Sequence, residues 1–250
     1  MRITGSVVIH QPHFLPWPPF IAKLALSDIF VVQDNVQYRK GYFQNRTRIM
    51  DERGEPKWLT LPVHAHSQSL LSETSLDHSN GRLIRHVRHA LQNSYCHARS
   101  YHSLWPCIDI FLRGLESPED QRMLASVNVA SILLLMTALN IEPPRVVYAS
   151  SLHLQGQSRT DRLLEILQFL GGRHYLVGWG ASAAVHDLSV LAREGIDTLA
   201  LDRSRATAIC PDFTATNGLS TVHWMMISDP SFTADRIRSY RQAVHHLEVA

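Results

Sequence analysis

The amino-acid sequence predicts an α/β protein whose parallel, Rossmann-like sheet is interrupted by a helical section of about sixty residues in the middle of the chain. Two short apolar runs, residues 7–9 and 29–32, are rich in β-branched side chains, which suit buried strands. Residues 145–201 alternate between strand-like and helix-like patterns with short links, which is typical of parallel strands joined by right-handed crossovers. Residues 81–139 instead repeat apolar side chains every three or four positions, which indicates helices.

Composition narrows the class of protein. The chain has 250 residues, of which 45% are hydrophobic and 18% charged, so it can bury a large core and is not predicted to be disordered. A net charge of +2 argues against nucleic-acid binding through bulk electrostatics. The longest apolar stretch, residues 127–139, is too short and too polar for a membrane span. Three cysteines without a CxxC pair, and an N-terminus without an apolar leader, predict a cytoplasmic protein.

The first third of the chain is predicted to place a rigid loop between its two strands. Prolines from Pro12 to Pro19 fix the backbone there, and Pro18 or Pro19 suits the first turn of a short helix. Residues 43–50 and 57–63 resemble the two arms of a hairpin, and residues 64–78 are predicted to form a polar loop.

The remaining elements follow from periodicity and from Gly and Pro boundaries. Helices are predicted at 81–99, 104–115, 118–139, 160–170, 183–194 and 234–249, strands at 146–148, 174–177 and 196–201, and irregular chain at 203–230. We expect an N-terminal half (1–63), a helical section (79–140) and a C-terminal half (145–250) that form one composite domain.

Polar side chains follow both N-terminal strands at the point where each strand ends. Because ligands bind at the carboxyl ends of parallel strands, we expect the active-site wall here. His10 is the candidate general base, although a histidine that only caps the loop is the simpler structural interpretation. Asp34 and Lys40 complete the predicted catalytic set, and a surface hairpin of mixed charge is the alternative for Lys40. The predicted substrate-binding residues in this region are Gln11, Trp17, Lys23, Gln37, Gln44, Asn45 and Arg46.

The C-terminal half contributes a second group of candidates. Arg159 and Arg162 open a predicted helix whose N-terminus suits an anion, although a plain capped helix start explains the pattern equally well. Gly178 and Gly180 permit close backbone approach after a strand, but their spacing is not a dinucleotide fingerprint. No zinc spacing, P-loop or GxSxG elbow is present, so no metal site is predicted. Cys96 and His97 are neighbours on a helix and point about 100° apart, which disfavours a nucleophile and base pair.

Several motifs resemble those of the WbqC-like protein family. They are HQPHFLPW, DNVQYRKGYFQNR and WLTLPV in the first third of the chain, and SLHLQGQSRTDRL and YLVGWGASA in the second half. The sequence departs from the family pattern at His13, where relatives have a small or amide residue. Residues 205–222 match the pattern only loosely, which leaves open whether they line the pocket.

The resemblance implies an enzyme of specialised-metabolite or surface-polysaccharide biosynthesis that transfers an acyl or aminoacyl group to an amine or hydroxyl acceptor. It suggests a thioester donor, including one borne by an acyl carrier protein, and no cofactor. In this interpretation His10 deprotonates the acceptor and Asp34 orients His10 or holds the acceptor's ammonium group. Gln11, Asn45 or Lys40 stabilise the oxyanion, and Arg46 and Arg162 bind an anionic part of the substrate.

Two alternatives stay open at the level of sequence. The first is ATP-dependent adenylyl transfer with Mg²⁺, in which His10 and His13 contact phosphates and Arg159 reaches the pyrophosphate. The order of elements favours it, but the diagnostic His-x-Gly-His is absent, because the chain has His10-x-x-His13. The second is a non-catalytic module that binds a carrier protein or a sugar nucleotide.

Overall fold

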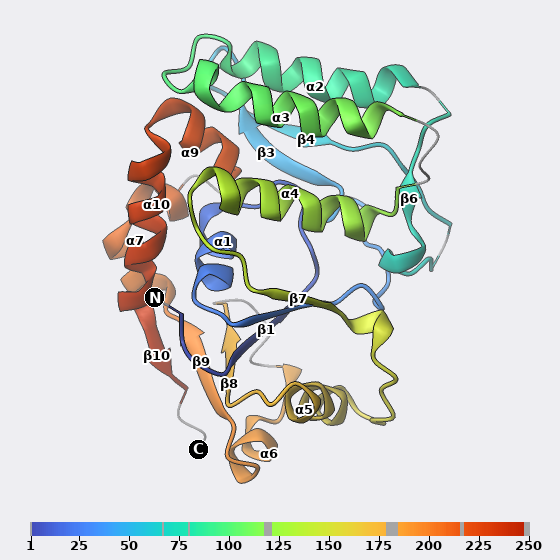
Figure 1. The fold of residues 1–250 in the computed structure, drawn as a ribbon, viewed down its shortest axis with the longest axis vertical. Coiled ribbons are helices and arrows are strands. Elements are labelled where there is room, and N and C mark those ends of the chain that lie inside the picture. Colours follow the sequence, from blue (N-terminus) through green and yellow to red (C-terminus); the bar gives the residue numbers. More distant parts are fainter. Residues whose placement is uncertain are drawn as a thin grey trace.

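The computed structural model describes residues 2–66, 68–79, 81–117, 122–178, 185–215 and 218–247. Its centre is a six-stranded, mostly parallel sheet, which confirms the predicted α/β fold (Figure 1). In sheet order the strands are β10 (Val244–His246), β9 (Asp197–Leu201), β8 (His174–Val177), β1 (Ser6–His10), β2 (Ile29–Val32) and β7 (Arg145–Tyr148). All neighbouring strands are parallel except β10, which pairs antiparallel with β9.

The direction in which the chain adds strands reverses beside β1. The chain first extends the sheet on one side, from β1 to β2 and then β7, and afterwards returns to place β8 and β9 on the other side of β1. This order, β7-β2-β1-β8-β9, is that of Rossmann-type sheets, in which ligands bind where the order reverses. The carboxyl ends of β1 and β8 are therefore the place to look for a site.

Helix α1 (Pro18–Ala25) joins β1 to β2 and is buried along its whole length. Two prolines start the helix in positions where a missing N–H does no harm. The sheet side of the helix and its opposite side are both covered, because α10 (Pro230–Ser239) packs against it. A helix with no solvent face must bury its one charged residue, Lys23, which is only 5% exposed.

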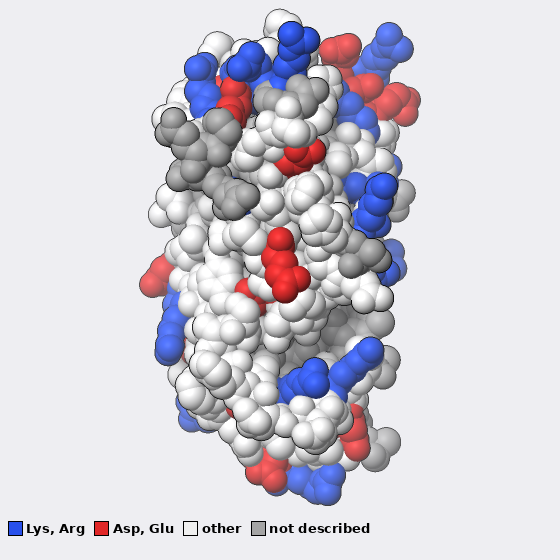
Figure 2. All heavy atoms as spheres, turned by 90° about the vertical axis from the view of Figure 1, so that its right-hand side faces the viewer, with Lys and Arg blue, Asp and Glu red and all other residues white. Residues whose placement is uncertain are grey.

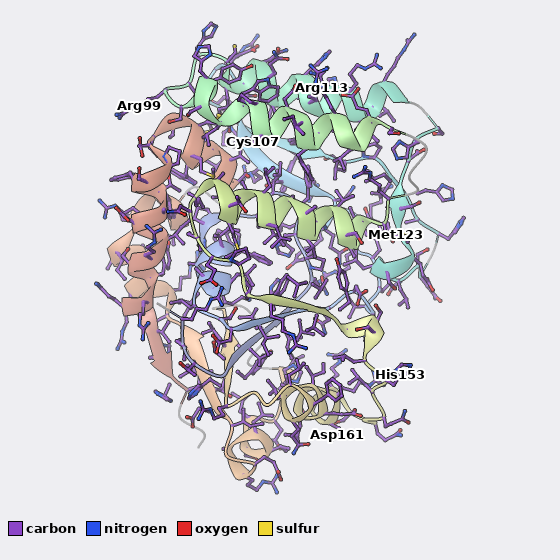
Figure 3. All side chains as sticks on the ribbon, viewed as in Figure 1. Arg99, Cys107, Arg113, Met123, His153 and Asp161 are labelled. Carbon is purple, nitrogen blue, oxygen red and sulfur yellow. The ribbon has the colours of Figure 1, made fainter. Side chains whose placement is uncertain are left out.

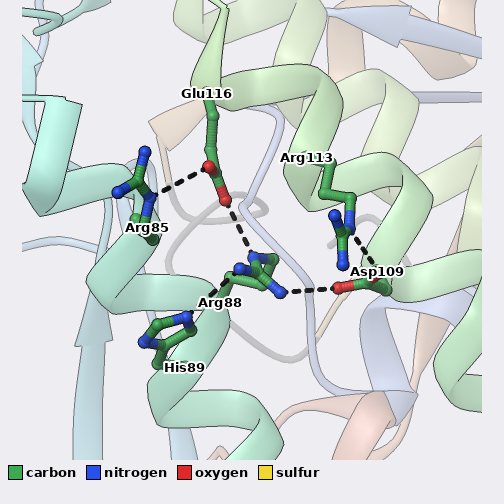
Figure 4. A network of polar contacts seen from close by, with 6 residues as sticks. All are labelled: Arg85, Arg88, His89, Asp109, Arg113 and Glu116. Atoms are coloured by element: carbon green, nitrogen blue, oxygen red, sulfur yellow. Dashed lines mark hydrogen bonds and ion pairs between the residues drawn. The ribbon is translucent and has the colours of Figure 1, made fainter.

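The helical section consists of α2 (Gly81–Tyr95), α3 (Tyr101–Glu116) and α4 (Leu124–Ala138). Helix α2 packs on a hairpin of β3 (Arg46–Met50) and β4 (Pro56–Thr60), which confirms the predicted hairpin. Arg88 of α2 ties the first two helices together through Glu116 at 2.8 Å and Asp109 at 3.0 Å (Figure 4). The three side chains are less than a quarter exposed, so this network is better shielded than an ordinary surface pair.

Several predicted boundaries were wrong. The stretch expected to be irregular holds α7 (Arg203–Ile209), α8 (Pro211–Ala215) and α9 (Thr221–Ile227), the first and last capped by Asp202 and Ser220. The expected terminal helix is split, because η4 (Tyr240–Ala243) ends the helical turn and β10 then pairs with the edge of β9.

The other differences are smaller and concern the middle of the chain. Helix α3 starts at Tyr101 rather than 104, and α4 at Leu124 rather than 118, with residues 118–121 outside the described part. The expected polar loop contains η1 (Leu71–Glu73) and a short pairing of β5 (Val63–His64) with β6 (Ser75–Leu76). Within the described residues, no helix has the length and apolar character that crossing a membrane requires.

Candidate active site

A cavity of about 310 Å³ opens at the carboxyl ends of β1 and β8, where the strand order reverses. His10 ends β1, Gly178 follows β8, and Phe20 and Lys23 of α1 form another wall. Figure 2 shows the face toward which β1 and β7 run, with a hollow in its lower half beside basic side chains. The other lining residues are His13, Trp17, Pro19, Tyr42, Phe43, Leu201, Arg203, Thr214 and Gly218.

The loop after β1 is held in one conformation by side chains from distant segments. Leu15 has a φ of 41°, a left-handed conformation that costs a non-glycine residue energy. Its N–H donates to the Ser131 hydroxyl at 3.0 Å, and its carbonyl accepts from Thr47 at 3.0 Å and Ser220 at 2.8 Å. Several hydrogen bonds hold this strained residue in place at the edge of the cavity. The loop is therefore fixed in one conformation before a ligand binds.

Asn128 of α4 joins this loop to the segment that carries Tyr42 and Phe43. Its buried side-chain amide donates to the Pro12 carbonyl at 2.9 Å and to the Gln44 carbonyl at 2.6 Å. One side chain therefore positions two walls of the cavity.

His10 presents one unprotonated nitrogen. Its Nδ1 lies 2.8 Å from the carbonyl oxygen of Gln11, which can only accept, so the proton of the neutral ring sits on Nδ1 and Nε2 carries a lone pair. Burial lowers the pKa of His10 well below its ordinary value, and the nearby Lys23 and His13 lower it further. His10 is therefore neutral at physiological pH and able to accept a proton.

His13 is an aromatic wall rather than a titrating group. Its ring stacks between Phe20 and Phe43, with centroids 5.0 and 5.6 Å away, and Tyr42 meets its edge at 5.6 Å. Neither ring nitrogen has a hydrogen-bond partner within the described structure, and burial lowers its pKa to about 3. The departure from the family pattern therefore adds apolar surface to the cavity at neutral pH.

Lys23 is the most unusual group in the cavity. None of the described residues that line the cavity carries a carboxylate, and the amino group lies over the Phe20 ring, 5.7 Å from its centroid. A Cβ atom at Gly178 would lie 3.9 Å from Nζ, so this backbone runs beside the amine. Burial lowers the pKa of Lys23 to about 7, which makes the amine exchange a proton readily at neutral pH.

The structure brings together only some of the residues expected to form the site. His10, Trp17, Lys23 and Gly178 line the cavity. Lys40, Asn45 and Arg46 line a second cavity of about 390 Å³ instead. The expected residues that line neither cavity are Gln11, Asp34, Gln37, Gln44, Arg159 and Arg162, and Gly180 lies outside the described residues.

Asp34 lines neither cavity and forms hydrogen bonds with Ser150, and its catalytic role stays a prediction. Both of its carboxylate oxygens accept hydrogen bonds from Ser150, one from the backbone at 2.9 Å and one from the hydroxyl at 2.6 Å. This pair ties the end of β2 to η2 (Ala149–Ser151), the turn after β7. Gln11 lines neither cavity, and its side-chain oxygen accepts a hydrogen bond from the Gln44 amide at 2.9 Å.

The two arginines expected to bind an anion lie on α5 (Arg159–Phe169). Ser158 caps this helix together with Asp161, and Figure 3 shows Asp161 on the far side of the sheet from α4. Arg162 donates to the carbonyl of Gly156 at 2.9 Å, so its guanidinium holds the preceding turn. A Cβ at Gly156 would lie 2.6 Å from the Arg162 backbone nitrogen, which explains the glycine.

The residues that sequence reasoning missed are mainly aromatic or come late in the chain. Tyr42 and Phe43 sit between two predicted polar residues, so an aromatic pair inside a polar motif was the available signal. Thr214 and Gly218 line the first cavity, so part of the segment 205–222, whose place the sequence left open, contributes to its wall. The cysteines line neither cavity, and Figure 3 shows Cys107 on α3. Within the described part of the chain, no group of His, Cys, Asp or Glu could hold a metal ion.

Comparison with known proteins supports a family assignment. Over 74 residues the chain is 32% identical to "Uncharacterized protein Rv1507c" of Mycobacterium tuberculosis, an alignment that covers 29% of this chain and about a third (32%) of that relative. No solved structure matches the chain. The model of the WbqC-like protein family matches residues 11–231, which include all but one of the residues that line the first cavity. The chain therefore belongs to the WbqC-like protein family.

Proposed function

We propose that the chain is a transferase that moves an acyl or aminoacyl group from a thioester to an amine or hydroxyl acceptor in the His10–Lys23 cavity. The observation that carries the proposal is the buried amine of Lys23, which has no carboxylate partner among the described lining residues and lies in the same cavity as a neutral His10. The acyl or aminoacyl transfer implied by the resemblance of the chain to WbqC-like proteins agrees with this reaction.

His10 accepts one proton during the reaction and Lys23 donates another. His10 Nε2 takes the proton from the acceptor's N–H or O–H as the new bond to the acyl carbon forms and the carbonyl electrons move onto oxygen. The tetrahedral intermediate then collapses, the C–S bond breaks, and the protonated Lys23 gives its proton to the departing thiolate. Transfer of the proton from His10 to Lys23 restores the starting state. No cofactor is needed for this sequence.

Lys23 stabilises the transition state more than the resting state, because the described walls of the resting cavity contain no negative charge. A protonated Lys23 has no counter-charge within the described walls, so the resting state gains little from it. When the carbonyl oxygen becomes an oxyanion, its negative charge attracts the Lys23 ammonium group. This attraction is strong because the cavity is poorly solvated. An interaction that forms only in the transition state accelerates the reaction.

The first experiment measures turnover of an aminoacyl N-acetylcysteamine thioester with hydroxylamine, an acceptor that is largely unprotonated at neutral pH. We expect His10→Ala to lower kcat/KM by about 100-fold or more, since general-base catalysis contributes this much. The exposed His153 provides the matched control, and His153→Ala should be unchanged. Equal rates for wild type and His10→Ala would contradict the proposal.

The pH dependence is a separate prediction. The reaction needs Lys23 protonated, and the pKa of Lys23 is about 7. We therefore expect kcat/KM to fall about tenfold per pH unit as the pH rises above this value. His10 should stay neutral to well below pH 6.5, because its pKa is lowered. A rate that instead rises through pH 7 to a plateau would show that the unprotonated amine is the active form.

ATP-dependent adenylyl transfer is the second candidate, favoured by one observation. The cavity lies where the strand order reverses, the position at which Rossmann-type sheets bind nucleotides. Thermal-shift titrations with ATP and Mg²⁺, beside thioesters, separate the two functions. Saturable stabilisation by the nucleotide alone would favour adenylyl transfer. A non-catalytic module would show binding that survives His10→Ala, without turnover of any donor.

A further inference from the structure

A second cavity of about 390 Å³ lies beside the first and is built differently. Its lining combines the cations Lys40 and Arg46 and the amide of Asn45 with apolar side chains. None of the described lining residues is acidic, so nothing in the described wall neutralises the two cations. The lining residues are Tyr38, Lys40, Gly41, Asn45, Arg46, Thr60, Leu61, Pro62, Val63 and Ala65.

Asn45, in the wall of this cavity, carries a buried acceptor without a partner. The residue is 6% exposed, and its side-chain nitrogen donates to the Leu61 carbonyl at 2.9 Å, which fixes the orientation of the amide. Its Oδ1 has no hydrogen-bond partner in the described structure. A buried acceptor that is left unpaired costs free energy, so a ligand with an N–H or O–H group would recover a stabilising contact.

Arg46 is a preorganised donor in the same wall. Its guanidinium lies over the Trp58 ring, 3.8 Å from the centroid, and it donates a hydrogen bond to the Gly41 carbonyl. Its Nε is buried and has no partner in the described structure. A guanidinium already held in one orientation loses little entropy when it binds an anion, and the exposed Lys40 adds a second positive charge.

The segment from Gly41 to Asn45 contributes to both cavities. Tyr42 and Phe43 line the first cavity, whereas Gly41 and Asn45 line the second. A ligand anchored in the second cavity therefore lies next to the wall of the first. An extended, flexible ligand can place its anionic end at Arg46 and its reactive end near His10.

We propose that the second cavity binds the phosphate and adjoining amide or hydroxyl groups of a phosphopantetheine arm, whose thioester end enters the first cavity. The inference rests on the proposed acyl transfer, for which it names the class of donor. Arg46 and Lys40 would hold the phosphate, and Asn45 Oδ1 would accept from an N–H or O–H group of the arm. The phosphate and the N–H or O–H groups of the arm match the cations and the acceptor in this wall.

Calorimetric titration of the purified protein with pantetheine 4′-phosphate and with pantetheine tests the inference. We expect the phosphorylated probe to bind at least tenfold more tightly. Lys40→Met and Arg46→Met should each weaken its binding about fivefold to tenfold while leaving pantetheine unchanged, and the exposed Arg53→Met is the matched control. Lys40 is exposed and has no packing role in the core, so its variant remains informative if Arg46→Met folds poorly.

Equal affinities for the two probes, or wild-type affinity in Lys40→Met and Arg46→Met, would overturn the inference. Turnover of the N-acetylcysteamine thioester is measured separately, and this donor has no phosphate. If that donor turns over but the phosphate adds no affinity, the inference fails and the proposed function stands. If the phosphorylated probe binds but no thioester turns over, the proposed function fails. Coenzyme A and a holo-carrier protein are titrated in the same way. Tighter binding of either supports the inference and identifies which molecule carries the phosphopantetheine group.

Discussion

Replacing Lys23 with methionine should lower acyl transfer by about 100-fold to 1000-fold and at the same time make the folded protein more stable. The loss of rate follows from removing the group that meets the oxyanion, since loss of one such donor has this effect in other enzymes. The gain in stability follows because methionine fills a similar volume and carries no charge into the core. Replacement of buried ionic groups by apolar ones often stabilises by about 1 to 4 kcal/mol.

The pH dependence of this stability gain has a definite sign. The pKa of Lys23 is lowered from 10.5 to about 7 in the folded state, so between these pH values the unfolded chain binds more protons than the folded one. The wild type therefore gains stability as the pH rises through this window, by an amount on the order of 4 kcal/mol. Lys23→Met lacks this contribution, so its advantage should be greatest near pH 7 and shrink as the pH approaches 10.

Urea unfolding at several pH values, together with thioester turnover, checks both effects. Lys57→Met is the control, because Lys57 lies on β4 and lines neither cavity. This variant should match the wild type in turnover and show no pH-dependent gain in stability. A stabilised Lys23→Met protein with full activity would refute the catalytic role of Lys23 and leave only its electrostatic cost.

Replacing Asn128 with alanine should lower the free energy of unfolding by about 2 to 4 kcal/mol. The buried carbonyls of Pro12 and Gln44 would each lose a hydrogen-bond donor, and loss of the unpaired Asn128 Oδ1 offsets only part of this. The same substitution releases two walls of the first cavity from each other. We expect turnover to fall about tenfold as well, because catalysis depends on the positions of these walls.

Denaturant unfolding and turnover measured well below the unfolding midpoint separate the two effects of Asn128→Ala. Asn93→Ala supplies the matched control, since Asn93 is exposed on α2. The control should change neither quantity by much. Full turnover in a destabilised Asn128→Ala protein would show that the asparagine stabilises the fold without positioning the cavity.

Local patterns were enough to predict most of the central sheet. Val7 and Val8 are fully buried in β1, as a β-branched run predicts, and 29–32 forms β2 within the predicted limits. The pattern could not show that β7 and β8 lie on opposite sides of β1 and β2, because the order of strands depends on contacts between distant segments. The same limit explains β10, whose short run becomes a strand only because β9 leaves a free edge.

The site was harder to predict because burial is set by the whole fold. Lys23 was predicted to bind substrate, but its burial could not be predicted, because only the packing of α10 against α1 closes its outer side. Asp34 looked like a partner for His10, but Ser150, which is 116 residues further along the chain, takes both of its oxygens. His10 was identified because a polar residue directly after a buried strand is a local signal, and the structure places it at the cavity.

The hydrogen bonds that hold the loop after β1 also constrain the order in which the molecule can assemble. The carbonyls of Leu15 and Pro16 are bonded by Ser220 and Thr221, 205 residues later in sequence. A contact of such sequence separation forms late, because a long stretch of chain must be ordered before its two ends meet. On the ribosome, most of the sheet can therefore form before the loop settles into the strained conformation of Leu15. The first cavity should be complete only after the last quarter of the chain has docked, so ligand binding in this cavity would report completion of the fold.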